Sequence, residues 1–362
     1  MAGRGDPPEG TPEGLPGGED EYRSVVFDEA FVQAARLQEF SAQERMGEHA
    51  QAVRSRPAWE GRGGGGSRQA LMLVLLILLA FGTAVYLGVR NPYQPPVDQP
   101  AEALRTTVVP LAPQGPVPGG EPAGLFAHSP AAEHRTGASG INLPMAARTT
   151  HFSESQVVAA LGIAKDYLVA SSLEPDVLAG LTVRPPRLLI DPDQLEQFDH
   201  SVASPKDDGR HAVGAWLVRF DPRRVVLADP SVRVQGTLRF AEINADVLEV
   251  TADHTFTYAV RPASTGSTGP QARASLFTVH RELRFRFDRD DLRMHRAELL
   301  TSTVQAGPQS CDGDTTGSLR PLLAGERAAG PEARAVTDPY ATSRPATSSL
   351  CGTLAPGAQP SF

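Results

Sequence analysis

The sequence predicts a single transmembrane helix followed by an extracytoplasmic α+β domain, in which helices pack on a curved antiparallel sheet. Three observations lead to this prediction: an uncharged apolar run at residues 70–89, a helix signature after residue 151, and strand-like alternation from residue 212 to residue 306. Helices that precede a long run of strands are typical of an α+β roll. A plain β-sandwich is the competing fold.

Composition limits the classes of function. The chain has 362 residues and a formal net charge of -8, and it contains 34 glycines and 32 prolines. So much glycine and proline, unevenly spread, indicates that a large part of the chain is linker or tail. The negative charge and the lack of a basic stripe with interleaved aromatic residues argue against nucleic-acid binding.

The apolar run predicts the topology. Residues 70–89 carry no charge, and at about 1.5 Å per residue they cover a hydrocarbon core of roughly 30 Å. Arginines are more frequent just before this run than after it, which predicts a cytoplasmic N-terminus and an extracytoplasmic C-terminus in the cell membrane. The arginines before the run are Arg54, Arg56, Arg62 and Arg68, and those after it are Arg90 and Arg105.

The segment before the apolar run falls into three parts. Residues 1–24 read as a disordered acidic tail and residues 57–69 as a Gly/Arg linker. Residues 25–56 are rich in helix formers, and Phe27 and Phe31 lie one turn apart on the same face. We expect these two side chains to dock on an unknown cytoplasmic protein or on the membrane surface. The alternative is a solvated nascent helix that docks on nothing.

Beyond the apolar run the chain divides again. Residues 90–150 are rich in proline and glycine and predict a semi-extended stalk, residues 151–306 predict the folded domain, and residues 307–362 predict an irregular tail. In the domain, Ser153 and Gln156 form a capping-box pattern at the start of a helix that ends near Ser172. A strand is expected at 187–190, and a second short helix follows Asp191.

The period of the apolar residues then changes to two, which is typical of strands with one buried face. The clearest alternation runs from Leu248 to Val260, and the last four strands look like an antiparallel meander. This element order resembles the NTF2-like fold, in which a helix packs into a concave sheet and often leaves a cavity. The predicted strand segments are AVGAWLVRF, RVVLAD, VRVQGTLRFAEI, DVLEVTADHTFTYAV, SLFTVHRELRFRF and LRMHRAELLTSTV.

The two cysteines, Cys311 and Cys351, both fall on the predicted outer side, where oxidation is permitted. We therefore expect a disulfide between them. Two unpaired thiols are the alternative, since spacing does not prove pairing.

No catalytic, cofactor-binding or metal-binding site is predicted. His254 lies on the apolar face of its strand and is more typical of a satisfied core or cavity residue than of a catalytic base. No metal-ligand spacing joins it to His280 or His295. Asp312 in CDGDTTG follows a polar run rather than an apolar strand, which argues against a phosphatase-type nucleophile loop. The acids in FDRDD and DPDQ are interpreted as turn and cap residues.

The N-terminal run VVFDEAFVQAARLQEFSAQER and the Gly/Arg linker after it resemble a family of actinobacterial single-pass membrane proteins of unassigned function. This resemblance implies membership and topology rather than an activity.

Together these features predict a non-enzymatic cell-envelope protein. An inner helix would bind a cytoplasmic partner, and the outer domain would bind an envelope protein or a small ligand. The alternative function is an extracytoplasmic enzyme that uses an NTF2-like cavity with His254 as its base. A cavity around His254 would favour the enzyme, and a packed interior would favour the binding protein.

Overall fold

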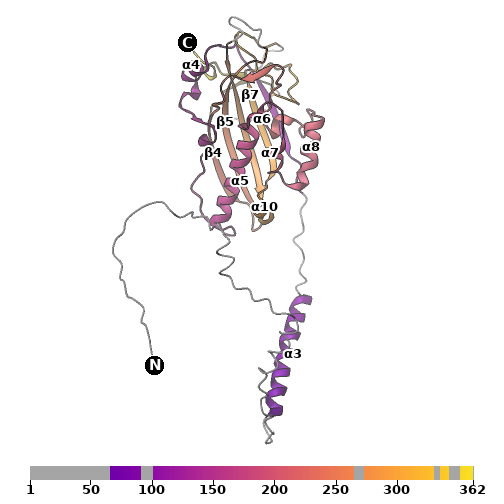
Figure 1. Ribbon diagram of the computed structural model, residues 1–362. Coiled ribbons are helices and arrows are strands. Elements are labelled where there is room, and N and C mark those ends of the chain that lie inside the picture. Colours follow the sequence, from indigo (N-terminus) through magenta and orange to yellow (C-terminus); the bar gives the residue numbers. More distant parts are fainter. Residues whose placement is uncertain (1–65, 91–100, 265–272, 330–334, 342–350, 362) are drawn as a thin grey trace, which may run out of the picture. The chain divides into compact units, whose positions relative to one another are not determined.

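The computed structural model describes residues 66–90, 101–264, 273–329, 335–341 and 351–361, and it divides into two units, Met1–Gln94 and Pro95–Phe362 (Figure 1). The predictions for residues 1–24, 25–56 and most of the linker, including docking through Phe27 and Phe31, lie outside the described residues.

The described part of the first unit is one helix, α3 (Gly66–Arg90), which covers the predicted apolar run. Its leucines are exposed, for example Leu71 and Leu78. Within the described residues, however, no helix combines the length and the apolar character that crossing a membrane requires. A bilayer core needs about 20 predominantly apolar residues. This finding contradicts the predicted transmembrane helix and the single-pass cell-membrane location that followed from it.

The second unit is built on a mixed sheet of nine strands in the order β2-β4-β5-β6-β7-β1-β9-β8, with β3 paired to β5. Strands β4 to β7 form the predicted antiparallel meander. Strand β1 lies parallel to β7 and to β9, and β8 lies parallel to β9. The strands are β1 (Arg105–Ala112), β2 (Arg135–Thr136), β3 (Val225–Leu227), β4 (Arg233–Glu242), β5 (Leu248–Pro262), β6 (Ser275–Phe287), β7 (Glu298–Gly307), β8 (Ala335–Thr337) and β9 (Gly352–Leu354).

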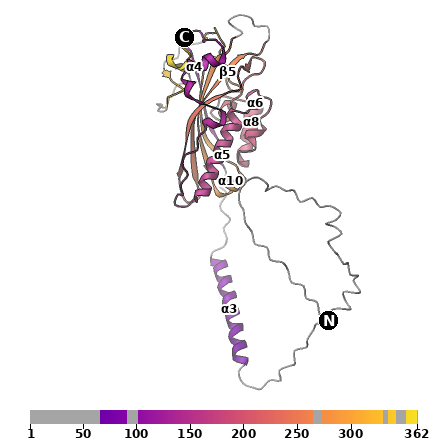
Figure 2. The same ribbon diagram turned by 60° about the vertical axis from the view of Figure 1, so that its left-hand side comes forward.

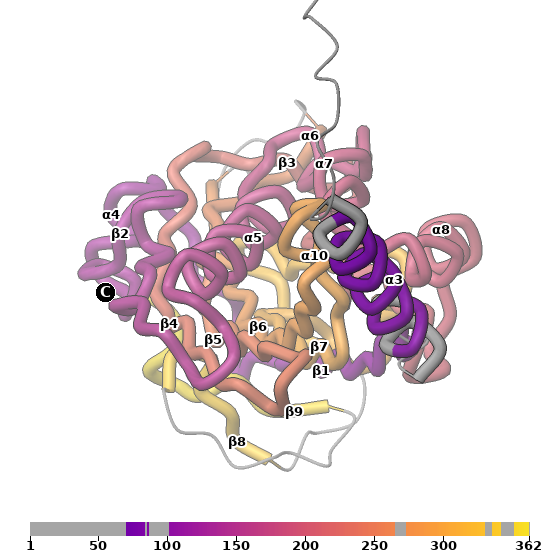
Figure 3. The backbone as a smooth tube through the Cα atoms, turned by 90° about the horizontal axis from the view of Figure 1, so that it is seen from below, coloured from indigo at the N-terminus to yellow at the C-terminus, as the bar shows by residue number. Residues whose placement is uncertain are grey.

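Helix α5 (Glu154–Ser172) begins with the predicted capping box, because the Ser153 side chain accepts from the Gln156 N–H and the Gln156 side chain accepts from the Ser153 N–H. Helix α5 and α10 lie on one side of the meander, and β8 and β9 lie on the other (Figure 3). The remaining helices are α4 (Pro122–Ala127), α6 (Pro175–Leu178), α7 (Arg184–Arg187), α8 (Leu195–Ala203), α9 (Val213–Trp216) and α10 (Arg289–Met294), with 3-10 turns η2 (Pro130–Glu133), η3 (Gly137–Gly140), η4 (Pro192–Gln194) and η6 (Pro356–Ala358).

The architecture corrects the predicted NTF2-like roll. The roll was expected to be a purely antiparallel sheet made from residues 212–306, but the observed sheet is mixed and also takes in β1, β2, β8 and β9. These strands come from segments that we interpreted as a stalk and an irregular tail. The β-sandwich is excluded as well, because the described strands form one continuous sheet. Strands β1, β8 and β9 are short apolar runs between prolines, and the sequence alone does not indicate the strands with which they pair.

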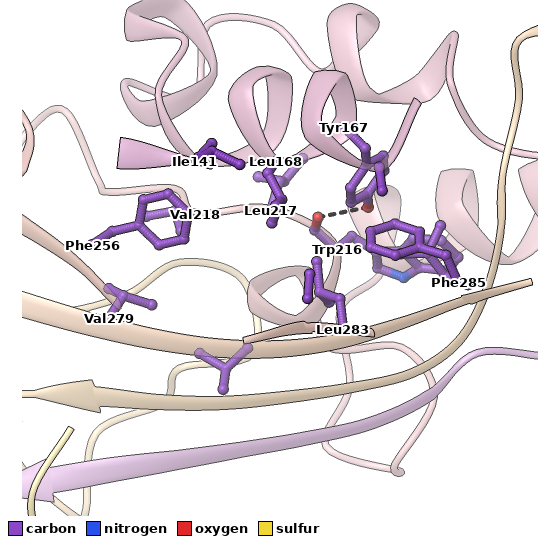
Figure 4. Packing of buried hydrophobic residues seen from close by; sticks show 14 of the residues in the cluster. Ile141, Tyr167, Leu168, Trp216, Leu217, Val218, Phe256, Val279, Leu283 and Phe285 are labelled. Carbon is purple, nitrogen blue, oxygen red and sulfur yellow. Dashed lines mark hydrogen bonds between the residues drawn. The ribbon is translucent and has the colours of Figure 1, made fainter. Parts of the chain in front are cut away.

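The core lies between α5 and the sheet (Figures 2 and 4). The alternation predicted in β5 is confirmed from Leu248 to His254, but from His254 to Val260 both faces of the strand are buried. Val250 and Phe256 lie in the core that α5 covers, whereas Thr255 and Thr257 on the other face are buried against Pro339 and Tyr340. Figure 4 shows Tyr167 of α5 donating through its hydroxyl to the Trp216 carbonyl, at 2.8 Å. Two strand predictions are wrong, because 187–190 contains the last residue of α7 and the turn after it, and AVGAWLVRF contains the helical turn α9. Both runs are apolar, and a short apolar run does not separate strand from helix.

Candidate functional site

A pocket of about 770 Å³ lies where five segments of the second unit meet. These segments are the residues before β1, the start of η4, the β4–β5 turn, the end of β6 with α10, and the start of β7. Seven of the lining side chains are carboxylic acids and two are arginines. The lining residues are Ala101, Asp191, Pro192, Asp193, Asn244, Ala245, Asp246, Val247, Arg286, Asp288, Asp290, Asp291, Met294, Arg296 and Glu298.

The backbone of α10 positions one wall of the pocket. Asp288 caps this helix by accepting from the N–H groups of Asp290 and Asp291, each at 2.7 Å. The Asp291 carboxyl in turn accepts a hydrogen bond from the Asp288 N–H at 3.1 Å. This reciprocal capping box holds the Asp291 side chain in place, with only 8% of the residue exposed.

Asp191 supplies the opposite wall. Its side chain caps η4 by accepting from the Asp193 N–H at 2.8 Å, and it also forms a hydrogen bond with the Asp291 side chain. Burial above all raises the pKa of Asp291, to about 8, and the nearby charges of Asp288 and Asp191 add to the rise. The Asp191–Asp291 pair therefore keeps a proton to a higher pH than an exposed carboxyl does.

Some of the pocket acids are neutralised by arginines. Arg286 binds Glu298 through two hydrogen bonds of 2.6 and 2.7 Å, although burial keeps the pKa of Glu298 above its usual value. Asp246 pairs with Arg289 at 2.8 Å, and Asp290 pairs with Arg293 at 2.6 Å.

The other acids lack such compensation. Asp191, Asp193 and Asp288 form no ion pair with any described residue. The pocket therefore has an excess of negative charge, and a positively charged group would reduce the repulsion among its carboxylates.

His254 lies elsewhere. Its ring is fully buried beside Phe256, and neither ring nitrogen has a hydrogen-bond partner among the described residues. Burial lowers the pKa of His254 to about 4. His254 does not line the acidic pocket, and the described residues contain no group of three or more His, Cys, Asp or Glu side chains that could hold a metal ion.

The predicted disulfide is confirmed. Cys311 and Cys351 are bonded, with their Cα atoms 5.7 Å apart, so the loop after β7 is tied to the residue that precedes β9. Asp312 is exposed in this loop, and the neighbouring Asp314 caps the turn by accepting from the Thr316 N–H at 3.0 Å. The motif CDGDTTG is therefore part of a turn.

The sequence did not reveal the pocket, although its acids were noticed. Both DPDQ and FDRDD were interpreted as caps, and Asp191 and Asp288 are caps in the structure. The number of aspartates in DPDQ and FDRDD could have pointed to the pocket, because it is larger than two helix caps require. What the sequence could not show is that these two caps face each other.

Comparisons with protein-family models, with curated proteins and with solved structures find no match. The resemblance of the N-terminal run to an actinobacterial membrane-protein family therefore stays a prediction.

Proposed function

We propose that the second unit is a non-enzymatic binding domain whose acidic pocket takes a small cationic ligand, such as a diamine or a guanidinium compound. The observation that carries this proposal is the pocket of about 770 Å³ with its excess of carboxylates. A volume of this size is within the range of small-molecule sites, which are roughly 300 to 1,000 Å³. The negative charge of the lining favours a cation, because carboxylates on most sides of the pocket would repel an anion.

The Asp191–Asp291 pair supports a cation in particular. Two carboxyls that share one proton keep that proton only because burial and mutual repulsion disfavour the second charge. A bound ammonium or guanidinium group would stabilise the second charge and release the proton. Binding near neutral pH is therefore expected to be accompanied by proton release.

A binding role agrees better than an enzyme with the surroundings of His254. The base that we considered for the alternative function is packed against Phe256, and its ring also lies against the backbone of Gly236, its pairing partner on β4. No room for a substrate adjoins the ring at these contacts. The acidic pocket lacks a histidine among its lining residues.

Isothermal titration calorimetry of the full chain with putrescine and agmatine tests the proposal. Titrations at pH 7 in two buffers of different ionisation enthalpy count the protons released. We expect binding by at least one of the two probes, proton release, and about tenfold or greater weakening in Asp193→Asn and Asp191→Asn. Glu282→Gln, which changes an exposed acid outside the pocket, is the matched control and should bind like the native protein. Equal binding by all four proteins, or binding by none, would contradict the proposal.

A further inference from the structure

Two histidines meet outside the acidic pocket. His200 is exposed in the last turn of α8, and His211 follows in the loop after that helix. Their ring centroids are 4.8 Å apart, and the ring planes are inclined at 63° in an edge-to-face arrangement. Two imidazoles at this separation are close enough to bind the same ion.

Asp208 fixes the orientation of one of these rings. Its carboxylate lies 2.6 Å from Nδ1 of His211 and accepts from the N–H groups of Arg210 and His211, each at 2.9 Å. Because a carboxylate only accepts hydrogen bonds, Nδ1 of His211 must carry the proton. The neutral ring then has its lone pair on Nε2, and a carboxylate in this position is a common support for a metal-binding histidine.

The loop is also attached to the helix that carries His200. Gln197, one turn before His200 on α8, donates through Nε2 to the carbonyl oxygens of Arg210 and Leu104, each at 2.9 Å. The backbone N–H of Lys206 donates to the His211 carbonyl at 3.1 Å and closes the loop. These hydrogen bonds hold the loop that carries His211 beside the helix that carries His200.

We propose that His200 and His211 form a two-histidine site for a divalent transition-metal ion, with Asp208 as the positioning residue. Two imidazoles bound through nitrogens at about 2.0 to 2.1 Å place their centroids roughly 4.5 to 5.2 Å apart, for ligand angles from about 90° to about 110°. The observed 4.8 Å lies in this range. Turning the His200 ring about its last side-chain torsion would direct a nitrogen toward the ion, and this torsion is soft.

The ligand set selects the class of ion. Imidazole suits copper, nickel and zinc, whereas calcium and magnesium prefer oxygen ligands. No third His, Cys, Asp or Glu completes the group within the described ranges, so water fills the other positions. With this ligand set the affinity should follow the order Cu²⁺ above Ni²⁺ and Zn²⁺.

Titration of the full chain with Cu²⁺ at pH 7.5, followed by calorimetry and by electron paramagnetic resonance, tests this site. We expect one Cu²⁺ with two imidazole nitrogens in its shell, and weaker binding by Zn²⁺. His200→Gln and His211→Gln should each reduce the affinity by at least about tenfold, and Asp208→Asn should reduce it by about 10- to 100-fold while both histidines remain. Binding should also weaken as the pH falls, because protons compete for the ring nitrogens.

His128→Gln and His151→Gln are matched controls, since both histidines are exposed and lie far along the chain from this loop. Neither substitution should change the affinity. A resonance spectrum with fewer than two imidazole nitrogens, or an affinity that is the same in the His200→Gln/His211→Gln double variant, would overturn the proposal. The circular dichroism spectrum of each variant verifies that the fold is intact, so that a loss of binding reports on the ligands.

Discussion

His254 makes the stability of the domain sensitive to acid. The ring is fully buried on the α5 side of β5, and neither ring nitrogen finds a hydrogen-bond partner among the described residues. Substitution of His254 by leucine removes the titratable group and both unpaired nitrogens while keeping a side chain of similar size. The change therefore isolates the effect of protonating this one ring.

The sign and size of the effect follow from the pKa of His254. Burial lowers it from 6.5 to about 4, so between these values the unfolded chain binds a proton that the folded chain does not bind. The stability contributed by the neutral ring is fully present above pH 6.5, is lost progressively as the pH falls from 6.5 to about 4, and is not reduced further below pH 4. A difference of this size corresponds to about 3 kcal/mol.

Other titrating groups change the stability in other pH ranges or with the opposite sign. Hydrogen bonds from Thr149 and His151 lower the pKa of Glu242 to about 2. A hydrogen bond from His211 lowers the pKa of Asp208 to about 2. Their contributions are lost mainly below pH 4.5. Asp291 opposes His254, because its raised pKa makes the folded chain bind the extra proton. The quantity to compare is therefore the difference between the variant and the native protein at each pH.

Urea unfolding at pH 7, 6, 5 and 4, followed by far-ultraviolet circular dichroism, measures this difference. From pH 7 to pH 4 the free energy of unfolding of His254→Leu should fall by about 3 kcal/mol less than that of the native protein. His128→Leu, at an exposed histidine, should follow the native protein at every pH. If His254→Leu loses as much stability as the native protein, His254 is not held neutral by burial and the reasoning is refuted.

Three further predictions concern other buried or covalent features. Arg281 is fully buried and donates to the Ser171 and Ser172 hydroxyls and to the Ala215 and Trp216 carbonyls at 2.7 to 2.9 Å. Arg281→Ala should therefore lower the free energy of unfolding by on the order of 3 to 5 kcal/mol in urea titrations. A loss below about 1 kcal/mol would contradict this prediction. Asp291→Asn keeps an oxygen for the Asp288 N–H but cannot ionise. The raised pKa of Asp291 makes its own contribution to the free energy of unfolding fall between pH 4 and pH 8, so on going from pH 5 to pH 8 this variant should lose less stability, or gain more, than the native protein, as compared by thermal melting at the two pH values. Cys311→Ser should destabilise the domain by up to about 4 kcal/mol, because the disulfide closes a loop with a sequence separation of 40, and Ser310→Ala is the control for the loop itself.

Local patterns predicted the elements that are stabilised by their own neighbours in sequence. The capping box at Ser153 and Gln156 and the strand at 275–287 occur where they were expected. A capping box needs only four consecutive residues, and an alternating strand shows its buried face in every second residue. The disulfide was expected on a different ground: the chain has just two cysteines, and both fall in the part that was predicted to lie on the outer side.

Features that depend on distant partners were not predicted. Strand β1 runs through Pro110 in a proline-rich stretch, and its place in the sheet comes from pairing with β7 nearly two hundred positions later. The run AVGAWLVRF is buried on every side around Trp216, so its apolar residues have no period that separates a strand from a turn of helix. Its conformation is decided by packing against other elements.

The acidic pocket belongs to this second kind of feature, and its origin can be traced to one contact. A short parallel bridge joins Ile190 to Ala297, and the N–H of Asp191 donates to the Ala297 carbonyl at 2.9 Å. This bridge brings the cap of η4 beside the cap of α10, so that Asp191 and Asp291 share a proton. Each cap alone would stabilise its helix by about 1 kcal/mol or less, but placed together the two carboxyls disfavour each other's charge. Since either cap function needs only a hydrogen-bond acceptor, which Asn or Ser also supplies, the paired acids are better explained by a cationic ligand than by the fold.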